Sequence, residues 1–177
     1  MHGCVLMASR TLSGFTLLEL IICMALFSVL LLLAAPAVHS MTELDRARQA
    51  LVLLDRHLTL ARLHAITHQT PVTICPLVNG RCTNFWHQEL TVFSDRDERA
   101  YFDKNDVKLM VLSEIRTSDT LDYPRTAITF KHTGTLKGFG NGTFVYCTQR
   151  LTGDPLGLAL SVSVVGRSRL RDTNKCM

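Results

Sequence analysis

The chain has 177 residues, a formal net charge of +4 and a hydrophobic fraction of 47%. Much of the apolar content is concentrated near the N-terminus, so the remaining length holds roughly one small, fairly polar domain, which argues against a multidomain protein. The charge is uneven, because from Arg125 onward eight basic residues stand against two acidic ones. A basic C-terminal third indicates an anionic partner, with an ordinary solvated surface as the alternative.

The N-terminal stretch combines a glycine-phenylalanine pair, an acid and a long apolar run. Gly14-Phe15-Thr16-Leu17-Leu18-Glu19 is followed by nineteen residues without a charge, Leu20 to Val38. This is about the length of a helix that crosses the core of a bilayer. The carboxylate of Glu19 lies at the start of the run, where an acid is unfavourable unless another group pairs with it.

These residues closely resemble the class III signal of type IV prepilins and pseudopilins. The resemblance implies that a prepilin peptidase removes residues 1–14 by cutting after Gly14, that Phe15 is then N-methylated, and that Glu19 meets the N-terminus of a neighbouring subunit. Residues 15–38 would form a membrane helix before assembly and part of the filament core afterwards. The protein would thus be a single-pass inner-membrane protein first and part of a cell-surface pilus later, with a periplasmic or extracellular globular domain. An ordinary secretory signal is the alternative, because residues 34–37 imitate its cleavage site.

The next segment, residues 39–69, is amphipathic. Its apolar residues recur at steps of three and four, which predicts one helical stripe that packs against a sheet. The stripe consists of Leu44, Ala47, Leu51, Leu54, Leu58, Ala61 and Ala65. Pro36 predicts a kink before this segment, because proline removes a backbone hydrogen bond. Thr70-Pro71 predicts the end of the helix, which is expected to run from Phe15 to about His68.

The remaining residues, 70–177, have the pattern of short strands and turns. Segments rich in β-formers and bounded by turn residues are 72–75, 90–93, 110–115, 127–131, 143–147 and 158–165. A long helix followed by short antiparallel strands predicts the α+β class. Phe85 and Trp86 are predicted to plug the core.

Four of the six cysteines, Cys75, Cys82, Cys147 and Cys176, follow the apolar run. In an oxidising compartment they are expected to form disulfides, for which three pairings exist. Pairing Cys75 with Cys82 closes a short loop around the turn signal Asn79-Gly80. That leaves Cys147 and Cys176 to staple the C-terminal tail to a strand. A zinc site is the competing interpretation, although the sequence has no C-x-x-C pair.

Two other patterns resemble metal sites. His64 and His68 have the i, i+4 spacing of metal-binding helices, but they lie with His57 beside the apolar stripe and are interpreted as partly solvated. The acidic stretch 94–106 begins like a calcium loop but lacks the glycine that such a loop needs. No metal and no cofactor are predicted.

The order of landmarks in the β-rich part resembles the GspH/FimT group of minor pilins and pseudopilins. The matching residues are Ile74-Cys75, Cys82, Trp86, Leu90-Thr91-Val92-Phe93 with Asp95, Thr129-Phe130 with Gly134, and Gly142-Thr143-Phe144 with Cys147. The resemblance implies a type IV pilin-like fold, in which a long N-terminal helix packs on an antiparallel β-sheet domain. It also implies major and minor pilins as partners in a filament.

Catalytic motifs are absent from the sequence. It contains no G-x-S-x-G, no phosphate-binding glycine loop and no H-E-x-x-H pattern. No nucleophile with a neighbouring base and an orienting acid is recognisable. The sequence therefore predicts a structural or binding protein and not an enzyme.

Three arginines alternate with other residues directly after Gly166: Arg167, Arg169 and Arg171. In an extended chain they lie on one solvent face, the same face as Ser161, about 6.7 Å apart. Alternatively, Gly166 breaks the strand and presents them on a loop. Arginine forks match phosphate oxygens well. Because no aromatic residue interleaves the arginines, base stacking is not expected and sequence preference should be weak.

This arrangement resembles the Gly-Arg-x-Arg element of FimT-type minor pilins that take part in DNA uptake. Gly166, Arg167 and Arg169 occupy the matching positions, while Arg171 and Lys175 are added from charge alone. The resemblance implies a minor pilin that binds DNA non-specifically during natural transformation. The alternatives without DNA binding are a structural or priming minor pilin and a type II secretion pseudopilin, in which the basic residues form a solvated tail or pair with acids of an adjacent pilin.

Overall fold

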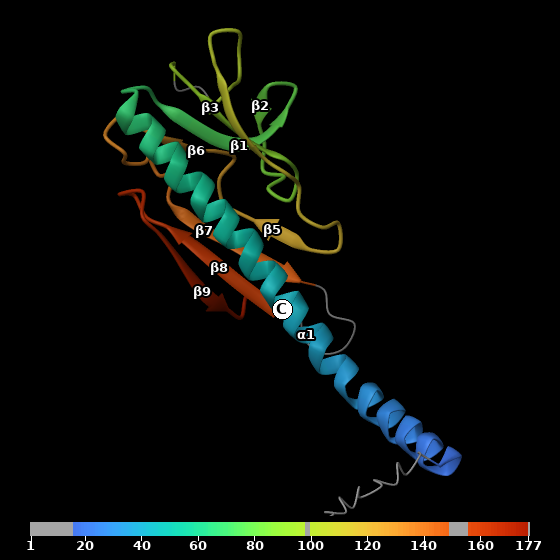
Figure 1. Cartoon of the computed structure of the whole chain (residues 1–177). Coiled ribbons are helices and arrows are strands. Elements are labelled where there is room, and N and C mark those ends of the chain that lie inside the picture. The colour runs from blue at the N-terminus through green and yellow to red at the C-terminus, as the bar shows by residue number, and fades with distance from the viewer. Residues whose placement is uncertain (1–15, 98–99, 149–155, 177) are drawn as a thin grey trace, which may run out of the picture. The chain divides into compact units, whose positions relative to one another are not determined.

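The computed structural model describes residues 16–97, 100–148 and 156–176, and Figure 1 labels most of its elements. These residues contain one helix, α1 (Leu17–Thr67), and nine strands. The chain divides after His39 into two compact units. The predicted processing residues Gly14 and Phe15 lie outside the described residues.

In the first unit, α1 begins with a capped turn. The hydroxyl of Thr16 accepts a hydrogen bond from the backbone N–H of Glu19 (3.3 Å), which satisfies a group that a helix start leaves unpaired. Glu19 is exposed in the first turn, where the helix dipole favours a negative charge. The large apolar side chains between Leu17 and Leu31 are exposed. Within the described ranges, no helix combines the length and the apolar character that a membrane span requires.

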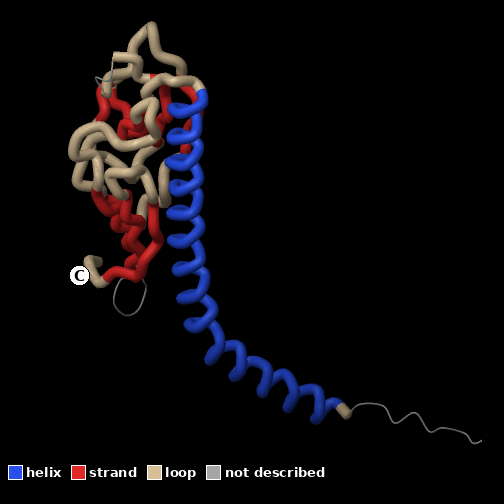
Figure 2. Tube along the Cα trace, turned by 90° about the vertical axis from the view of Figure 1, so that its left-hand side faces the viewer, coloured by secondary structure: helices blue, strands red, loops and turns tan. Residues whose placement is uncertain are grey.

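In the second unit, α1 buries the apolar stripe that its sequence predicts. The buried members are Ala47, Leu51, Leu54, Leu58, Ala61 and Ala65, with Leu44 partly buried beside them. The helix ends at Thr67, shortly before Gln69 adopts a left-handed backbone conformation with φ of 49°. A left-handed residue just past the last turn commonly stops a helix, and Pro71 prevents its continuation. Figure 2 shows the helix along one side of the strands in this unit.

The strands form two sheets in which every pairing is antiparallel. The first sheet contains β2 (Arg81–Cys82), β1 (Val72–Val78), β3 (Leu90–Ser94) and β4 (Lys108–Leu112) in spatial order, and β6 (Ile128–Phe130) also pairs with β1. The second contains β5 (Thr120–Asp122), β7 (Gly142–Thr148), β8 (Leu156–Val162) and β9 (Ser168–Thr173) in that order. One core of buried residues joins α1 to both sheets. The predicted α+β fold, with the N-terminal helix packed on a sheet domain, is confirmed.

The C-terminal strands differ from the prediction. β8 ends at Val162 and not at Val165, because the chain turns there and returns as β9, a strand that was not predicted. Gly166 lies in the turn of this hairpin and interrupts the strand, as one of the two alternatives predicted, but only Arg167 is left outside β9. Arg169 and Arg171 therefore lie on a strand.

An aromatic cluster fills the core beneath the helix. Trp86 is fully buried, meets the rings of Tyr123 and Phe144 edge-on (centroids 5.3 and 5.0 Å), and donates from Nε1 to the carbonyl oxygen of Arg125 (2.6 Å). The prediction for Trp86 is confirmed. The prediction for Phe85 is wrong, since this side chain is 45% exposed. The two neighbours point to different sides of an irregular segment, and only one of them reaches the core.

Two disulfides join the four predicted cysteines. Cys75 and Cys82 are bonded across the turn between β1 and β2, with 5.5 Å between their Cα atoms. Cys147 of β7 is bonded to Cys176, with a Cα–Cα distance of 5.6 Å. The predicted pairing is confirmed, and the bonded sulfurs do not form the competing zinc site.

Candidate nucleic-acid interface

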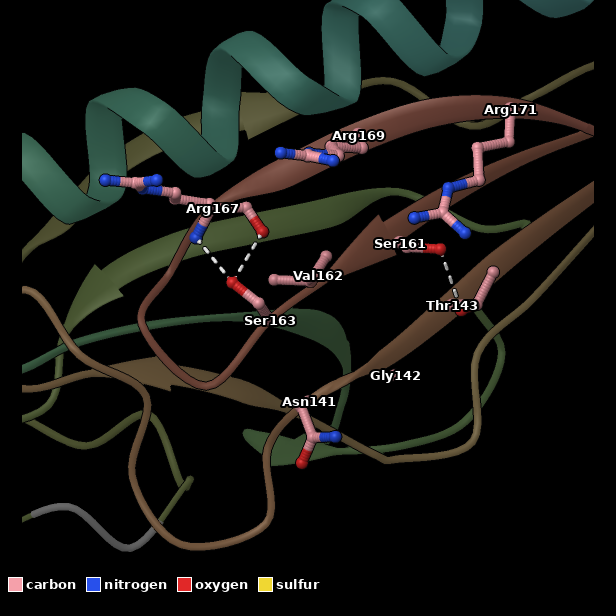
Figure 3. A pocket seen from close by; sticks show the side chains of 9 residues that line it. All are labelled: Asn141, Gly142, Thr143, Ser161, Val162, Ser163, Arg167, Arg169 and Arg171. Atoms are coloured by element: carbon pink, nitrogen blue, oxygen red, sulfur yellow. Dashed lines mark hydrogen bonds between the residues drawn. The ribbon is translucent and has the colours of Figure 1, made fainter.

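The candidate site is built on the hairpin of β8 and β9, at an edge of the second sheet. The N–H of Ser163 donates to the carbonyl of Arg167, and the N–H of Gly166 to the carbonyl of Ser163, each at 2.8 Å. Gly166 has φ of 73°, the left-handed position that ends a three-residue hairpin loop and favours glycine. The hydroxyl of Ser163 also accepts from the N–H of Arg167 and donates to its carbonyl, both at 3.1 Å (Figure 3). The turn thus determines where β9, the arginine strand, begins.

The register of this hairpin places Arg169 and Arg171 on one face, and Arg167 lines the same groove just before β9. Arg169 lies opposite Ser161 and Arg171 opposite Ala159, and directly opposed residues of an antiparallel pair share a face. Alternate residues of β8 point into the core: Leu158, Leu160 and Val162. Arg169 and Arg171 therefore belong to the opposite, solvent face, and all three arginines are exposed.

An open groove of about 440 Å³ lies beside the arginines on this face. Its lining comes from β7, β8, β9 and the residues next to them: Asn141, Gly142, Thr143, Ser161, Val162, Ser163, Arg167, Arg169 and Arg171 (Figure 3). The hydroxyls of Thr143 and Ser161 are hydrogen-bonded to each other in its floor (3.1 Å). Two strand spacings separate β7 from β9, roughly 10 Å. The groove therefore combines a polar floor with a row of cations along one side.

The three guanidinium groups are available to a ligand. Within the described part of the chain, none of them forms an ion pair. Asp172, the acid of β9, lies opposite the buried Leu158 and thus belongs to the other face of the strand. A guanidinium fork binds two phosphate oxygens at once, and neighbouring cations of one sign raise the local concentration of anions. This face can therefore hold a polyanion.

Two residues of α1 hold the hairpin in place. Arg62 donates from Nε to the carbonyl of Gly134 (2.8 Å) and from Nη1 to the carbonyl of Gly166 (3.4 Å). Seven residues earlier, Asp55 accepts a hydrogen bond from the hydroxyl of Ser168, the first residue of β9. Positions seven apart lie on nearly the same side of a helix. The helix thereby anchors both the turn and the start of the arginine strand.

Sequence reasoning missed both anchors, because Arg62 lies 104 residues from Gly166 and Asp55 lies 113 from Ser168. Their positions beside the buried stripe were the available signal, but nothing local identified their partners. Gly166 was predicted as part of the site, and the fold gives it a backbone role. A Cβ atom there would lie 2.7 Å from the carbonyl oxygen of Gly134. Only glycine fits both this approach and the left-handed conformation.

The Cys147–Cys176 disulfide closes the other end of the arginine strand. Cys147, Gly157 and Thr173 form one row across β7, β8 and β9, and Cys176 folds back over this row. A Cβ atom on Gly157 would lie 2.6 Å from the sulfur of Cys176, so glycine leaves room for the bridge. Lys175 is exposed near this end, with its N–H donating to the hydroxyl of Thr173 (3.3 Å), and it is not part of the groove lining.

A second polar cluster joins the helix to the sheet around the buried Asp119. Arg46 donates to both carboxylate oxygens (3.1 and 3.2 Å), and the hydroxyl of Tyr146 donates to one of them (2.7 Å). The hydrogen bond to Glu43 is the main cause that raises the pKa of the Arg46 guanidinium, and burial raises the pKa of Tyr146. Arg46 thus keeps its charge and Tyr146 its proton, so Asp119 stays paired. The cluster is a structural joint between α1, β7 and the segment before β5.

Two family matches agree with this architecture. The family described as "Type II transport protein GspH" matches residues 53–166, more than half of the chain. This chain belongs to the GspH family. The "Prokaryotic N-terminal methylation motif" matches residues 10–35, so the chain belongs with the type IV pilins and pseudopilins of the GspH/FimT kind. Pilins are structural subunits that associate with other pilins, and the methylation motif implies processing by a prepilin peptidase.

Solved structures give the same fold. The type IV minor pilin FimU of Pseudomonas aeruginosa strain PAO1, in space group P21, is 20% identical over 80% of this chain and 100% of its own, with a TM-score of 0.56. A second crystal form of FimU, in space group P65, is 21% identical over 73% of this chain and 99% of its own, with a TM-score of 0.55. No curated protein matches the sequence. The GspH match ends at residue 166, so Arg167, Arg169 and Arg171 lie just beyond the residues that match the family.

Proposed function

We propose that this minor pilin binds DNA non-specifically through the arginine face of β9 during DNA uptake in natural transformation. The observation that carries the proposal is the register of the β8–β9 hairpin. It supports one row of Arg167, Arg169 and Arg171 on the solvent face, next to an open polar groove. Phosphates are spaced regularly along a nucleic acid, and contacts to them carry no sequence information. Binding is therefore insensitive to sequence.

The affinity of one subunit is weak, because three phosphate contacts release few counterions. Several copies in one filament, or several filaments on one DNA molecule, raise the apparent affinity without new contacts. The anchors on α1 and the disulfide favour binding, since a face that is already ordered loses less entropy when it meets DNA.

The experiment measures DNA affinity of the full chain in detergent by fluorescence anisotropy across a salt series. Three phosphate contacts predict a slope of log affinity against log salt near −2 to −3. The double variant Arg167→Ala, Arg169→Ala should lose its affinity for DNA molecules of unrelated sequence to the same extent. Its melting temperature should stay almost unchanged, because both side chains are exposed. The matched control is Arg48→Ala with Arg56→Ala, which removes the same charge from exposed positions of α1. Normal binding by the first variant, with the wild-type slope, would refute the proposal.

The processing steps are proposed on the N-terminal motif. Cleavage after Gly14 frees an amino group on Phe15 that pairs with Glu19 of a neighbouring subunit, which offsets the unfavourable burial of that carboxylate. Residues 15–38 then anchor the pilin in the inner membrane as a single span until it enters a cell-surface filament. Intact-mass measurement should show the loss of residues 1–14 and one added methyl group. A mature chain that starts at Ala37 would indicate an ordinary secretory signal instead.

A second candidate function is assembly without DNA binding, as a structural or priming minor pilin or as a type II secretion pseudopilin. The observation in its favour is the apolar outer side of α1 in the second unit, where Val52, Leu53, Leu60 and Leu63 are exposed. Under this function, deletion of the gene reduces filament formation or protein secretion. The Arg167→Ala, Arg169→Ala variant then restores the deletion strain fully.

A further inference from the structure

Phe139 has the highest exposure of the large apolar side chains in the described part of the chain, at 85%. It lies between Gly138 and Gly140, in the loop that leads into β7. A Cβ atom on Gly138 would meet nothing within 4 Å, so the backbone next to Phe139 also borders open space. A single exposed aromatic side chain is common on protein surfaces, so a ligand for the ring is inferred from what surrounds it.

The backbone around Phe139 is nevertheless held firmly. Arg125 donates from Nε to the carbonyl of Phe139 (2.9 Å), and the hydroxyl of Tyr123 donates to the carbonyl of Gly140 (2.6 Å). Tyr123 itself is buried in the aromatic cluster of the core. The N–H of Gly140 closes a turn onto the carbonyl of Lys137 (3.2 Å). The loop therefore holds the backbone still and leaves the ring of Phe139 in solvent.

This loop borders the arginine groove on the side away from β9. Asn141, two residues after Phe139, lines the groove together with the three arginines, and Figure 3 shows it across the groove from Arg167 and Arg169. The exposed Arg125 lies beside the loop through its bond to the Phe139 carbonyl. The loop next to Asn141 thus carries an exposed aromatic ring and has an exposed cation bonded to its backbone, although neither side chain lines the groove itself. Positively charged grooves combined with aromatic side chains are the arrangement that binds single-stranded nucleic acid.

We propose that Phe139 is a stacking platform for an unpaired base of a DNA strand whose phosphates lie on the arginines of β9. This inference rests on the proposed DNA-binding function and adds a preference for single-stranded over double-stranded DNA. The faces of bases inside a duplex are already stacked on their neighbours, so they cannot stack on Phe139. No sequence pattern indicates this role, because Phe139 lies 28 to 32 residues before the arginines.

The test compares binding of a single-stranded oligonucleotide and of a duplex of the same length to the full chain in detergent. Phe139→Ala should lower affinity for the single strand roughly 5- to 100-fold, the range that one stacked base gives. Its affinity for the duplex and both salt slopes should stay the same, since no phosphate contact is lost. Phe139→Trp should keep single-strand affinity and show quenching of the new exposed indole on binding. Val165→Ala is the matched control, because Val165 is an exposed apolar residue of the adjacent hairpin turn and should change neither affinity.

The outcomes separate this inference from the proposed function. If wild type binds both DNAs through its arginines and Phe139→Ala binds the single strand normally, the stacking platform is refuted and the DNA-binding function stands. If Phe139→Ala weakens both DNAs equally, the ring shapes the groove and does not stack on a base, which also refutes the platform. If Phe139→Ala leaves DNA binding intact but reduces filament assembly, the ring contacts a neighbouring subunit. If wild type binds neither DNA, the proposed function fails and this inference fails with it.

Discussion

Replacing Arg62 with methionine tests whether the arginine face must be held in advance by the helix. Methionine keeps an apolar stem of similar length but removes the guanidinium that bonds to the carbonyls of Gly134 (2.8 Å) and Gly166 (3.4 Å). The first bond is short and charge-assisted, and the second is long and weak. Hydrogen bonds to charged groups contribute about 1.5–3 kcal/mol, so the free energy of unfolding should fall by about 2 kcal/mol. For a unit of this size, the melting temperature should fall by roughly 4–8 °C.

The same variant should bind DNA several-fold more weakly, because the hairpin turn must now be ordered during binding. The slope of log affinity against log salt should not change, since Arg167, Arg169 and Arg171 are still present. The matched control is Arg56→Met, which removes an equal charge from an exposed position of the same helix and should alter neither stability nor affinity. Thermal melting and anisotropy titrations measure both effects. If Arg62→Met behaves like Arg56→Met in both assays, the helix does not position the arginine strand and the reasoning is wrong.

Three further predictions concern stability. The Cys147–Cys176 bridge spans 29 residues and Cys75–Cys82 spans 7, so replacing the first pair by serines should cost about 3–4 kcal/mol in urea unfolding and replacing the second only about 2.5 kcal/mol, in the chain-entropy account. Gly166→Ala should destabilise by more than about 1 kcal/mol in the same assay, because alanine is strained at φ of 73° and would crowd the Gly134 carbonyl. Burial, and after it the charge of the neighbouring His68, lower the pKa of His64 below 6.5. The unfolded chain then binds more protons, so stability should fall as pH drops below about 6.5 toward the lowered pKa. His64→Gln should flatten this part of the melting temperature profile against pH.

The parts of the fold that were predictable depend on local repetition. The buried stripe of α1 follows from apolar residues at steps of three and four, and the Cys75–Cys82 bridge from a turn signal between close cysteines. Phe85 and Trp86 show the limit of this reasoning, because adjacent aromatic residues in an irregular segment have equal propensity but different burial. Strand β9 was missed because a six-residue strand that carries two arginines and an aspartate lacks the β-rich composition by which strands are recognised.

The candidate site could be predicted only in part, because local patterns identify some of its residues and not others. The alternation of arginines is visible in the sequence, and the register places Arg169 and Arg171 on one face as an extended chain requires. The groove could not be predicted, because its far side comes from residues before β7 that approach β9 only through β8. The roles of Arg62 and Phe139 could not be predicted for the same reason. Their significance depends on contacts between segments that are far apart in sequence, and no local pattern encodes such contacts.

The position of the arginines on β9 admits two physical explanations, and reversing their charge separates them. β9 is an edge strand of the second sheet, and charged residues on edge strands prevent pairing with another chain. Charges of either sign serve that purpose, whereas phosphate binding requires positive ones. Arg167→Glu with Arg169→Glu should therefore leave the protein unaggregated in analytical ultracentrifugation and unchanged in melting temperature, yet abolish DNA binding even at low salt. Arg167→Lys with Arg169→Lys should bind with the wild-type salt slope but lower affinity, because lysine supplies the charge without the two-pronged fork. If the glutamate variant still binds DNA, the arginines serve to protect the edge and the DNA site lies elsewhere on this pilin.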